Sequence, residues 1–216
     1  MHMDNTVERL NQYQKSVIIG TMLGDGYLRI VPGRRDAFLE VNHAHNQCEY
    51  VEWKYKVLEN VSGKSPIVRN GNGKRRAIRF HTRQSAELTQ LYNWFYKDKT
   101  KVIPSDLVLD PLILATWFMD DGSWCRASDV YLNTQQFSHH DQQILLDALV
   151  KIGLQASLNK DKEYQRIRFV KTSIPALVEL VKPHIIPSMQ YKIGLESVET
   201  TRQSPALSKC DYRLEV

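Results

Sequence analysis

Two aspartates, Asp25 and Asp121, occupy the same place in two similar stretches of the sequence, GTMLGDGYL at 20–28 and TWFMDDGSW at 116–124. In each stretch an apolar segment ends in the acid, and a glycine follows. If the apolar segments are helices, both carboxylates lie at helix C-termini, where the backbone dipole is also negative. Such a place favours a hard divalent cation, which prefers oxygen ligands. The pattern therefore predicts a site for Mg²⁺, with Mn²⁺ or Ca²⁺ as substitutes, and phosphodiester hydrolysis, in which a bound cation activates water.

The spacing of two glycines indicates how the acids come together. Gly20 and Gly24 lie four residues apart and share one face of the helix predicted over residues 10–24. Glycine inside a helix costs about 1 kcal/mol relative to alanine, so two on one face indicate the close approach of another backbone. The predicted partner is the helix over residues 111–119. Its packing on the first helix brings Asp25 and Asp121 together.

Each motif is followed by the same series of predicted elements. The triplet Ile-Arg-Phe recurs at 78–80 and 167–169, each time in the second strand of a predicted hairpin. The first half reads as an alternating stretch at 38–46, a helix at 49–61, a hairpin at 67–82 and a helix at 85–97. The second half repeats this series at 130–138, 140–153, 156–172 and 174–187. The chain therefore contains an internal duplication.

The predicted fold class is α+β, with two pseudo-symmetric repeats of the order helix, two strands, helix, two strands, helix. Helices cover one face of an antiparallel sheet in each repeat and leave the other face open. The predicted domains are residues 1–105 for the N-terminal repeat, 106–200 for the C-terminal repeat and 201–216 for a tail. Proline, serine and aspartate residues cluster at 104–111 and mark the boundary.

The charge balance predicts an anionic partner. Lys and Arg number 29 against 24 for Asp and Glu, which gives a net charge of +5 and an isoelectric point near 9.0. Side chains alternate along a strand, so about half of the basic residues in the hairpins reach a nucleic-acid groove. The candidate DNA-binding residues are Arg29, Arg34, Arg35, Arg69, Asn70, Asn72, Lys74, Arg75, Arg76, Arg79, Asn159, Lys160, Lys162, Arg166 and Arg168.

The histidines suggest another kind of site, a His-Asn-His nuclease or a zinc centre. Strand alternation places His43 and His45 on one side, and His139-His140 forms a second cluster. Their spacing does not complete a metal site, so we expect surface or DNA-facing histidines. No G-x-S-x-G motif supports a nucleophilic hydrolase.

The sequence also predicts an intracellular protein, in a bacterial or archaeal cytoplasm or in an organelle. No run approaches the ~20 apolar residues of a membrane span, and the polar start contains no signal-peptide core. The start and end of the chain do not have the residues of an intein, so we expect a free-standing protein.

The motifs resemble the LAGLIDADG homing endonucleases, in particular the monomeric, intron-encoded type with two motifs. The segments IIGTMLGDG at 18–26 and LATWFMDDG at 114–122 are similar to the family signature. The resemblance implies a saddle of antiparallel sheets that binds a long, near-palindromic DNA site. It also implies that the two motif helices pack at the interface between the repeats. One aspartate from each motif, Asp25 and Asp121, then holds the metal ions that cut both strands and leave 3′ overhangs.

Other site residues follow from the same resemblance. Lys101 and Lys192 are placed where similar monomeric members keep basic residues near the cleavage centre, and a lysine there orients water or neutralises charge on the phosphate. Gly20, Gly24 and Thr116 are the predicted helix-interface residues. Asp120 matches Gly24 in the motif and ranks behind Asp121 as a metal ligand.

Two other functions remain open on the same fold. The chain is either a site-specific endonuclease or a binding protein, which would be an RNA-binding splicing maturase or a regulator that binds DNA without cutting. Both acids are retained, and this favours cutting, because a protein that only binds gains little from negative charges beside phosphate.

Overall fold

The structure is a computed structural model that describes residues 9–70, 75–126 and 129–195. The described chain forms two compact units. Within the described residues, the first contains 9–15 and Asp25–Asn93, and the second contains Ser16–Gly24 and 94–195. These units are defined by packing, and the first motif helix contributes most of its length to the second unit. The boundary between sequence repeats at residue 105 stays a prediction.

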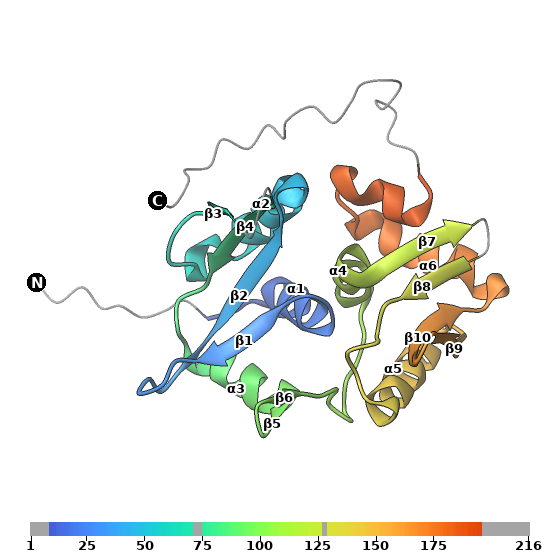
Figure 1. The fold of residues 1–216 in the computed structure, drawn as a ribbon, viewed down its shortest axis with the longest axis horizontal. Helices are drawn as coiled ribbons and strands as arrows, with labels where there is room; N and C mark the ends of the chain where they lie inside the picture. The colour runs from blue at the N-terminus through green and yellow to red at the C-terminus, as the bar shows by residue number, and fades with distance from the viewer. Residues whose placement is uncertain (1–8, 71–74, 127–128, 196–216) are drawn as a thin grey trace, which may run out of the picture. The chain divides into compact units, whose positions relative to one another are not determined.

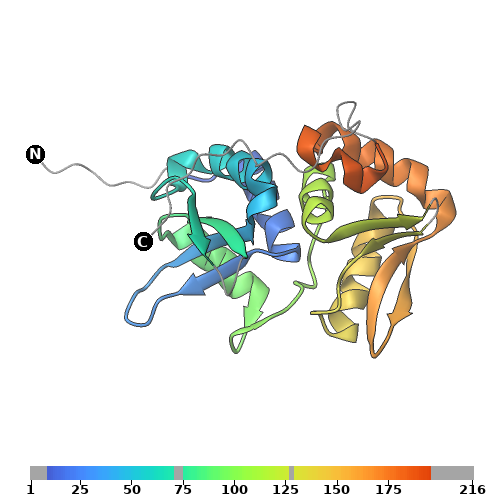
Figure 2. The ribbon, with the colours of Figure 1, turned by 45° about the horizontal axis from the view of Figure 1, so that its top comes forward.

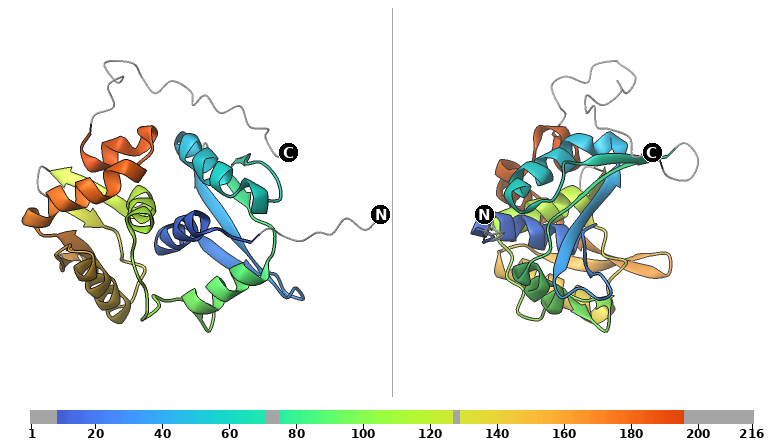
Figure 3. Two further views of the ribbon diagram at one scale, coloured as in Figure 1. Left: turned by 180° about the vertical axis from the view of Figure 1, so that it is seen from behind. Right: turned by 90° about the vertical axis from the view of Figure 1, so that its left-hand side faces the viewer.

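The first unit is built on a four-stranded antiparallel sheet (Figure 1). Its strands are β1 (Tyr27–Ile30), β2 (Ala37–Ala44), β3 (Ile67–Asn70) and β4 (Arg76–His81), in the order β1-β2-β4-β3. Helices α2 (Cys48–Val57) and α3 (Ala86–Phe95) lie at opposite ends of the long strand β2 (Figure 3). Alternate residues of the strands are buried, among them Leu39, Val41, Ile78 and Phe80. The intervening side chains form the open face of the first sheet.

The second unit contains a sheet with the same topology. Its strands are β7 (Gly122–Arg126), β8 (Asp129–Leu132), β9 (Ala156–Asp161) and β10 (Tyr164–Phe169), in the order β7-β8-β10-β9. Helix α5 (His139–Lys151) packs on β9 and β10, and α6 (Ile174–Val181) packs on α4 (Pro111–Asp121) (Figure 2). A short hairpin of β5 (Tyr96–Lys97) and β6 (Thr100–Lys101) precedes α4. The α+β fold with two like sheets is therefore confirmed.

Short 3₁₀ helices complete the described chain. They are η1 (His45–Gln47), η2 (Glu59–Val61), η3 (Lys171–Ser173), η4 (Lys182–His184) and η5 (Pro187–Ile193). Several of them lie where a predicted element ends early. The alternating stretch predicted to Asn46 ends at Ala44, where η1 begins, and the helix predicted over 49–61 ends at Val57.

The two motif helices are α1 (Gln12–Leu23) and α4. The carboxylate of Asp110 caps α4 by accepting a hydrogen bond from the Ile113 N–H at 2.7 Å, and Pro111 occupies the first turn. The Ser16 hydroxyl of α1 donates to the same carboxylate at 2.6 Å, so the cap also joins the two helices. Residues 112–120 are all buried, which explains why α4 is apolar on every side. Among the described residues, no helix has the length and apolar composition needed to cross a membrane.

Candidate active site and nucleic-acid interface

The motif helices touch at matched positions within the second unit. A Cβ atom added to Gly20 would lie 2.6 Å from both the Ile113 carbonyl oxygen and Thr116 Cβ. A Cβ added to Gly24 would lie 2.4 Å from Asp120 Cβ. Position 20 thus faces position 116, and position 24 faces position 120, which are equivalent places in the two motifs. The second motif tolerates Thr116 and Asp120 because the facing positions of the first motif are glycines.

A lysine holds the last turn of each motif. Lys101 Nζ donates to the Gly24 carbonyl oxygen at 2.9 Å, and Lys192 Nζ donates to the Asp120 carbonyl oxygen at 2.8 Å. Both lysines are partly buried. Gly24 and Asp120 directly precede Asp25 and Asp121 in the sequence. The two lysines therefore make equivalent bonds, although one precedes an Ile-Pro pair and the other follows one.

The second motif ends in a polar setting. The carbonyl oxygen of Asp121 accepts hydrogen bonds from the Asn133 N–H at 3.0 Å and from Asn133 Nδ2 at 2.9 Å. Gln136 Nε2 lies 3.4 Å from Asp121 Oδ2. Both partners belong to the segment after β8, which the sequence predicted to be strand as far as Ser138. Asn133 and Gln136 were not among the predicted site residues, and only the polar run 133–136 signalled them.

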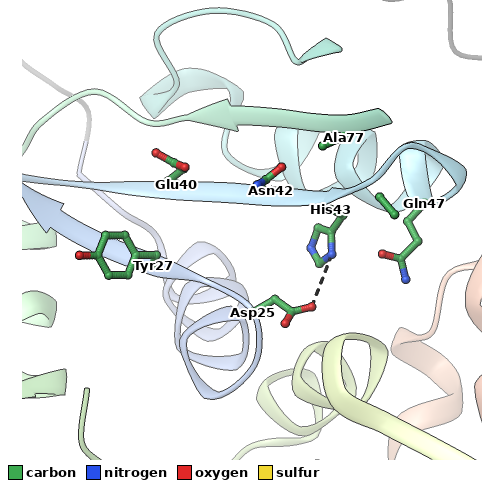
Figure 4. Close-up of a pocket in the computed structure, with 8 residues that line it drawn as sticks. Asp25, Tyr27, Glu40, Asn42, His43, Gln47 and Ala77 are labelled. Carbon is green, nitrogen blue, oxygen red and sulfur yellow. Dashed lines mark ion pairs between the residues drawn. The ribbon is translucent and has the colours of Figure 1, made fainter. Parts of the chain in front are cut away.

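The first motif ends beside a buried histidine, His43. The side chain of Asp25 is 54% exposed, and its Oδ2 atom lies 3.7 Å from Nδ1 of His43, whose side chain is 3% exposed (Figure 4). Lys54 Nζ of α2 lies 3.4 Å from the other ring nitrogen, Nε2. Lys54 is fully buried, and its ammonium lies 4.4 Å from the centre of the Tyr50 ring. Sequence reasoning missed Lys54, because its position on an amphipathic helix is typical of a solvated lysine.

The predicted surface placement is correct for His139 and His140, which are exposed, and wrong for His43. His43 and His45 do not share a side, since β2 ends between them, and His43 is buried rather than at the surface. Burial and, to a smaller degree, the nearby charge of Arg76 lower the pKa of His45. A lowered pKa favours the neutral form of the His45 imidazole.

A pocket of about 450 Å³ opens beside Asp25 in the first unit. Tyr27, Glu40 and Asn42 line it from the open face of the first sheet, and His43 and Gln47 complete its polar lining. Figure 4 shows Glu40 and Asn42 on one side of β2 and His43 on the other. The lining offers both hydrogen-bond donors and acceptors, which is the chemistry that reads base edges.

Strand register sorts the predicted DNA-binding residues. Arg79 pairs with Asn42 and Arg168 pairs with Tyr131 in the two β ladders, so both arginines lie on open sheet faces. The predicted residues on the open faces are Arg29, Arg69, Arg79, Asn159, Arg166 and Arg168. Those in loops, in turns or on the opposite side of a strand are Arg34, Arg35, Asn70, Arg75, Arg76, Lys160 and Lys162. Asn72 and Lys74 lie outside the described residues.

Aromatic and acidic neighbours hold the open-face arginines in place. The guanidinium of Arg166 lies 3.9 Å from the centre of the Tyr131 ring, and that of Arg168 lies 6.0 Å from it. Arg168 also bonds Asp129 at 2.5 Å, while Arg79 lies 4.0 Å from Glu40. These contacts reduce the side-chain entropy that the arginines lose when they bind a ligand.

Paired motif helices, two sheets of one topology and an acid after each motif define a LAGLIDADG protein. Residues 15–177 match the LAGLIDADG DNA endonuclease family, and the chain belongs to this family.

Named relatives include both maturases and endonucleases. The chain is 32% identical to the cytochrome b mRNA maturase bI2 of Saccharomyces cerevisiae, over 89% of this chain and 50% of that protein. It thus spans about half the length of this relative. It is 28% identical to the probable intron-encoded endonuclease 1 of Wickerhamomyces canadensis, over 85% of each chain.

Solved structures share the fold. The homing endonuclease I-WcaI, bound to its DNA recognition sequence, superimposes with a TM-score of 0.79 at 27% identity, over 86% of this chain and 88% of that chain. An I-DmoI variant in complex with nicked target DNA, in the presence of manganese, has a TM-score of 0.51 at 10% identity, over 81% and 98% of the two chains. The second match shows only the fold.

Proposed function

We propose that the chain is a metal-dependent, site-specific endonuclease that cuts both strands of DNA and acts as a monomer. The observation that carries the proposal is that a lysine makes an equivalent hydrogen bond at the end of each motif helix. Lys101 bonds the carbonyl of the residue before Asp25, and Lys192 bonds the carbonyl of the residue before Asp121. A duplicated active centre of this kind suits two strands of opposite direction, with one motif from each of the repeats 1–105 and 106–200.

The donor atoms after the motif helices fit a hard divalent cation. Asp25 and Asp121 both offer carboxylate oxygens, and neither residue is buried. We therefore assign Asp25 and Asp121 as ligands for Mg²⁺, with Mn²⁺ or Ca²⁺ as substitutes. When bound, the ion polarises the scissile phosphate and lowers the pKa of the attacking water.

The lysines contribute positive charge that is already in position. Each ammonium is fixed by a backbone carbonyl and is partly buried, so little reorganisation is needed when the phosphate arrives. Lys101 and Lys192 thereby stabilise the negative charge that develops on the phosphate. The contact between Gly24 and Asp120 aligns the two helix ends from which the acids project.

The open sheet faces supply the DNA contacts. Arg79 in the first unit and Arg168 in the second occupy equivalent places in the two sheets, which fits a long, near-palindromic site. Arginine reads guanine edges in the major groove by paired hydrogen bonds, while exposed lysines contact phosphates. Cleavage across the minor groove then leaves 3′ overhangs.

A selection from randomised DNA duplexes tests this function. Duplexes that the protein retains in Ca²⁺ are recovered and then incubated with Mg²⁺ or with a chelator. We expect both strands to be cut at one place in Mg²⁺, with 3′ overhangs, and no cutting in the chelator. The double variant Asp25→Asn, Asp121→Asn is expected to bind the same duplexes without cutting them. Cutting by the double variant, or no cutting of any bound duplex by the wild type, would contradict the proposal.

A second candidate is an RNA maturase that assists splicing. The observation in its favour is the 32% identity to the yeast cytochrome b mRNA maturase bI2. Filter binding of the chain to its host intron RNA, followed by a splicing assay, tests this activity. Acceleration of splicing by the Asp25→Asn, Asp121→Asn variant would show that maturase activity does not depend on the two aspartates. Absence of specific RNA binding would exclude a maturase function.

A further inference from the structure

A lysine and a histidine are buried together beside Asp25. Lys54 has no exposed surface, and His43 is 6% exposed, although both carry polar nitrogen atoms. Burial removes an ammonium group from water, and this cost must be offset by polar partners inside the protein. Lys54 Nζ finds the His43 ring nitrogen Nε2 at 3.4 Å and the face of the Tyr50 ring at 4.4 Å.

The duplication shows that the sheet itself does not require this pair. In the first sheet His43 pairs with Ile78, and in the second sheet Leu132 pairs with Ile167. Since Ile78 and Ile167 are equivalent in the repeated Ile-Arg-Phe triplet, Leu132 occupies the place of His43. Leu132 is fully buried. The second half therefore has a leucine at this strand position, whereas the first half has a histidine.

The hydrogen-bonding capacity of the two groups fixes the tautomer of His43. With Lys54 as an ammonium group, which only donates hydrogen bonds, Nε2 of His43 accepts from Lys54. In a neutral imidazole the proton then resides on Nδ1. This Nδ1–H is the atom that faces the Asp25 carboxylate, with Nδ1 3.7 Å from Oδ2 (Figure 4).

We propose that Lys54 and His43 are positioning residues for Asp25. Lys54 holds His43 as the Nδ1–H tautomer, and His43 directs this N–H at the Asp25 carboxylate and restricts its rotation. The role in cleavage rests on the proposed endonuclease function, whereas the tautomer is a property of the free protein. Outer partners of metal ligands orient them in this way, and their loss typically lowers activity by about 10–100-fold.

Nitrogen NMR tests the tautomer without any DNA. The full chain is labelled with ¹⁵N in its histidine rings, and His43 is assigned by comparison with a His43→Leu variant. We expect an Nδ1 that carries hydrogen and an unprotonated Nε2 in the wild type. In Lys54→Met, the Nε2–H tautomer is expected to gain population. Lys56→Met is the matched control, because Lys56 is exposed on the same helix and pairs with Glu52. An Nε2–H tautomer in the wild type, or an unchanged ring in Lys54→Met, would overturn the proposal.

Cleavage kinetics test what the tautomer does. The double variant His43→Leu, Lys54→Met places a leucine where the second half has Leu132 and removes the buried ammonium group. Its thermal midpoint is therefore expected to equal or exceed that of the wild type. With a duplex from the selection, its single-turnover cleavage is expected to fall about 10–100-fold while the Kd for the duplex stays unchanged. Wild-type cleavage by this folded variant would overturn the positioning role. If the wild type cuts no duplex, the endonuclease proposal fails instead, and the NMR result stands by itself.

Discussion

The two motif ends share their backbone contacts and differ in what surrounds the acid. Lys101 and Lys192 bond equivalent carbonyl oxygens at nearly equal distances, 2.9 and 2.8 Å. Asp25, in contrast, lies beside the buried base His43, whereas Asp121 lies beside Gln136, an exposed amide. The duplication therefore preserves the placement of the helix end and varies the environment of the carboxylate. We therefore expect the two strands of a DNA site to be cut at different rates.

Apart from loss of the motif aspartates themselves, the largest expected effect comes from the lysines that the two halves share. Lys101→Met and Lys192→Met each remove a fixed positive charge, and each is expected to lower the rate of cutting by about 10²–10³-fold, in the range found for single groups that stabilise developing charge. The measurement is single-turnover cleavage with each strand labelled separately. Equal losses would confirm that the lysines are equivalent. A loss of cutting for only one of the two variants would show that the two lysines are not equivalent.

Stability tests the matched helix contact. Gly24→Ala places a Cβ atom 2.4 Å from Asp120 Cβ and is expected to reduce the free energy of unfolding by about 1–3 kcal/mol through overpacking. Adding Asp120→Gly moves the glycine to the facing helix and is expected to restore most of the loss. Urea unfolding measures both variants. Gly63→Ala is the control, because its added Cβ meets nothing within 4 Å. Equal effects of Gly24→Ala and the control would contradict the close contact.

Each sheet is expected to read the sequence of only one half of the DNA site. Arg79→Ala and Arg168→Ala should each lower discrimination at their own half of the DNA site by about 1–3 kcal/mol per base pair and leave the other half unchanged. Repeating the duplex selection with each variant measures this effect. Lys160→Ala is the control, since Lys160 lies on the opposite side of its strand from Arg168 and Asn159. Loss of readout in both halves after one substitution would contradict the assignment.

The smallest expected effect concerns the exposed partner of Asp121. Gln136→Ala removes the amide 3.4 Å from the Asp121 carboxylate, a long and exposed contact for which we expect no more than the about 0.5–1.5 kcal/mol of an ordinary hydrogen bond. We expect a slowdown of about tenfold or less, which strand-resolved cleavage measures. A loss as large as that expected for the lysines would show that Gln136 has a greater role than its geometry indicates.

Local signals predicted much of the fold. The order of elements and the repeated sheet follow from apolar periodicity and the duplicated Ile-Arg-Phe triplet, and Asp110-Pro111 begins α4 as its capping chemistry predicts. Strand ends were less predictable. β2 gives way to η1 at His45 although the alternation of residue types continues.

The surroundings of the candidate site depend on contacts between distant parts of the chain. Lys54 comes from α2 and reaches His43 of β2 only in the folded unit, and no spacing rule links these residues. Lys101 and Lys192 are equivalent in space but not in sequence, because β6 supplies one and η5 the other. Residue types therefore indicated the chemistry, and tertiary packing determined the partners.

Strand-resolved cutting of a supercoiled plasmid that carries a selected site tests most directly whether the two motif aspartates hydrolyse DNA. We expect Asp25→Asn and Asp121→Asn to bind this plasmid like the wild type and to fail to linearise it in Mg²⁺. Linearisation at the wild-type rate by either variant would show that hydrolysis does not depend on the two motif aspartates.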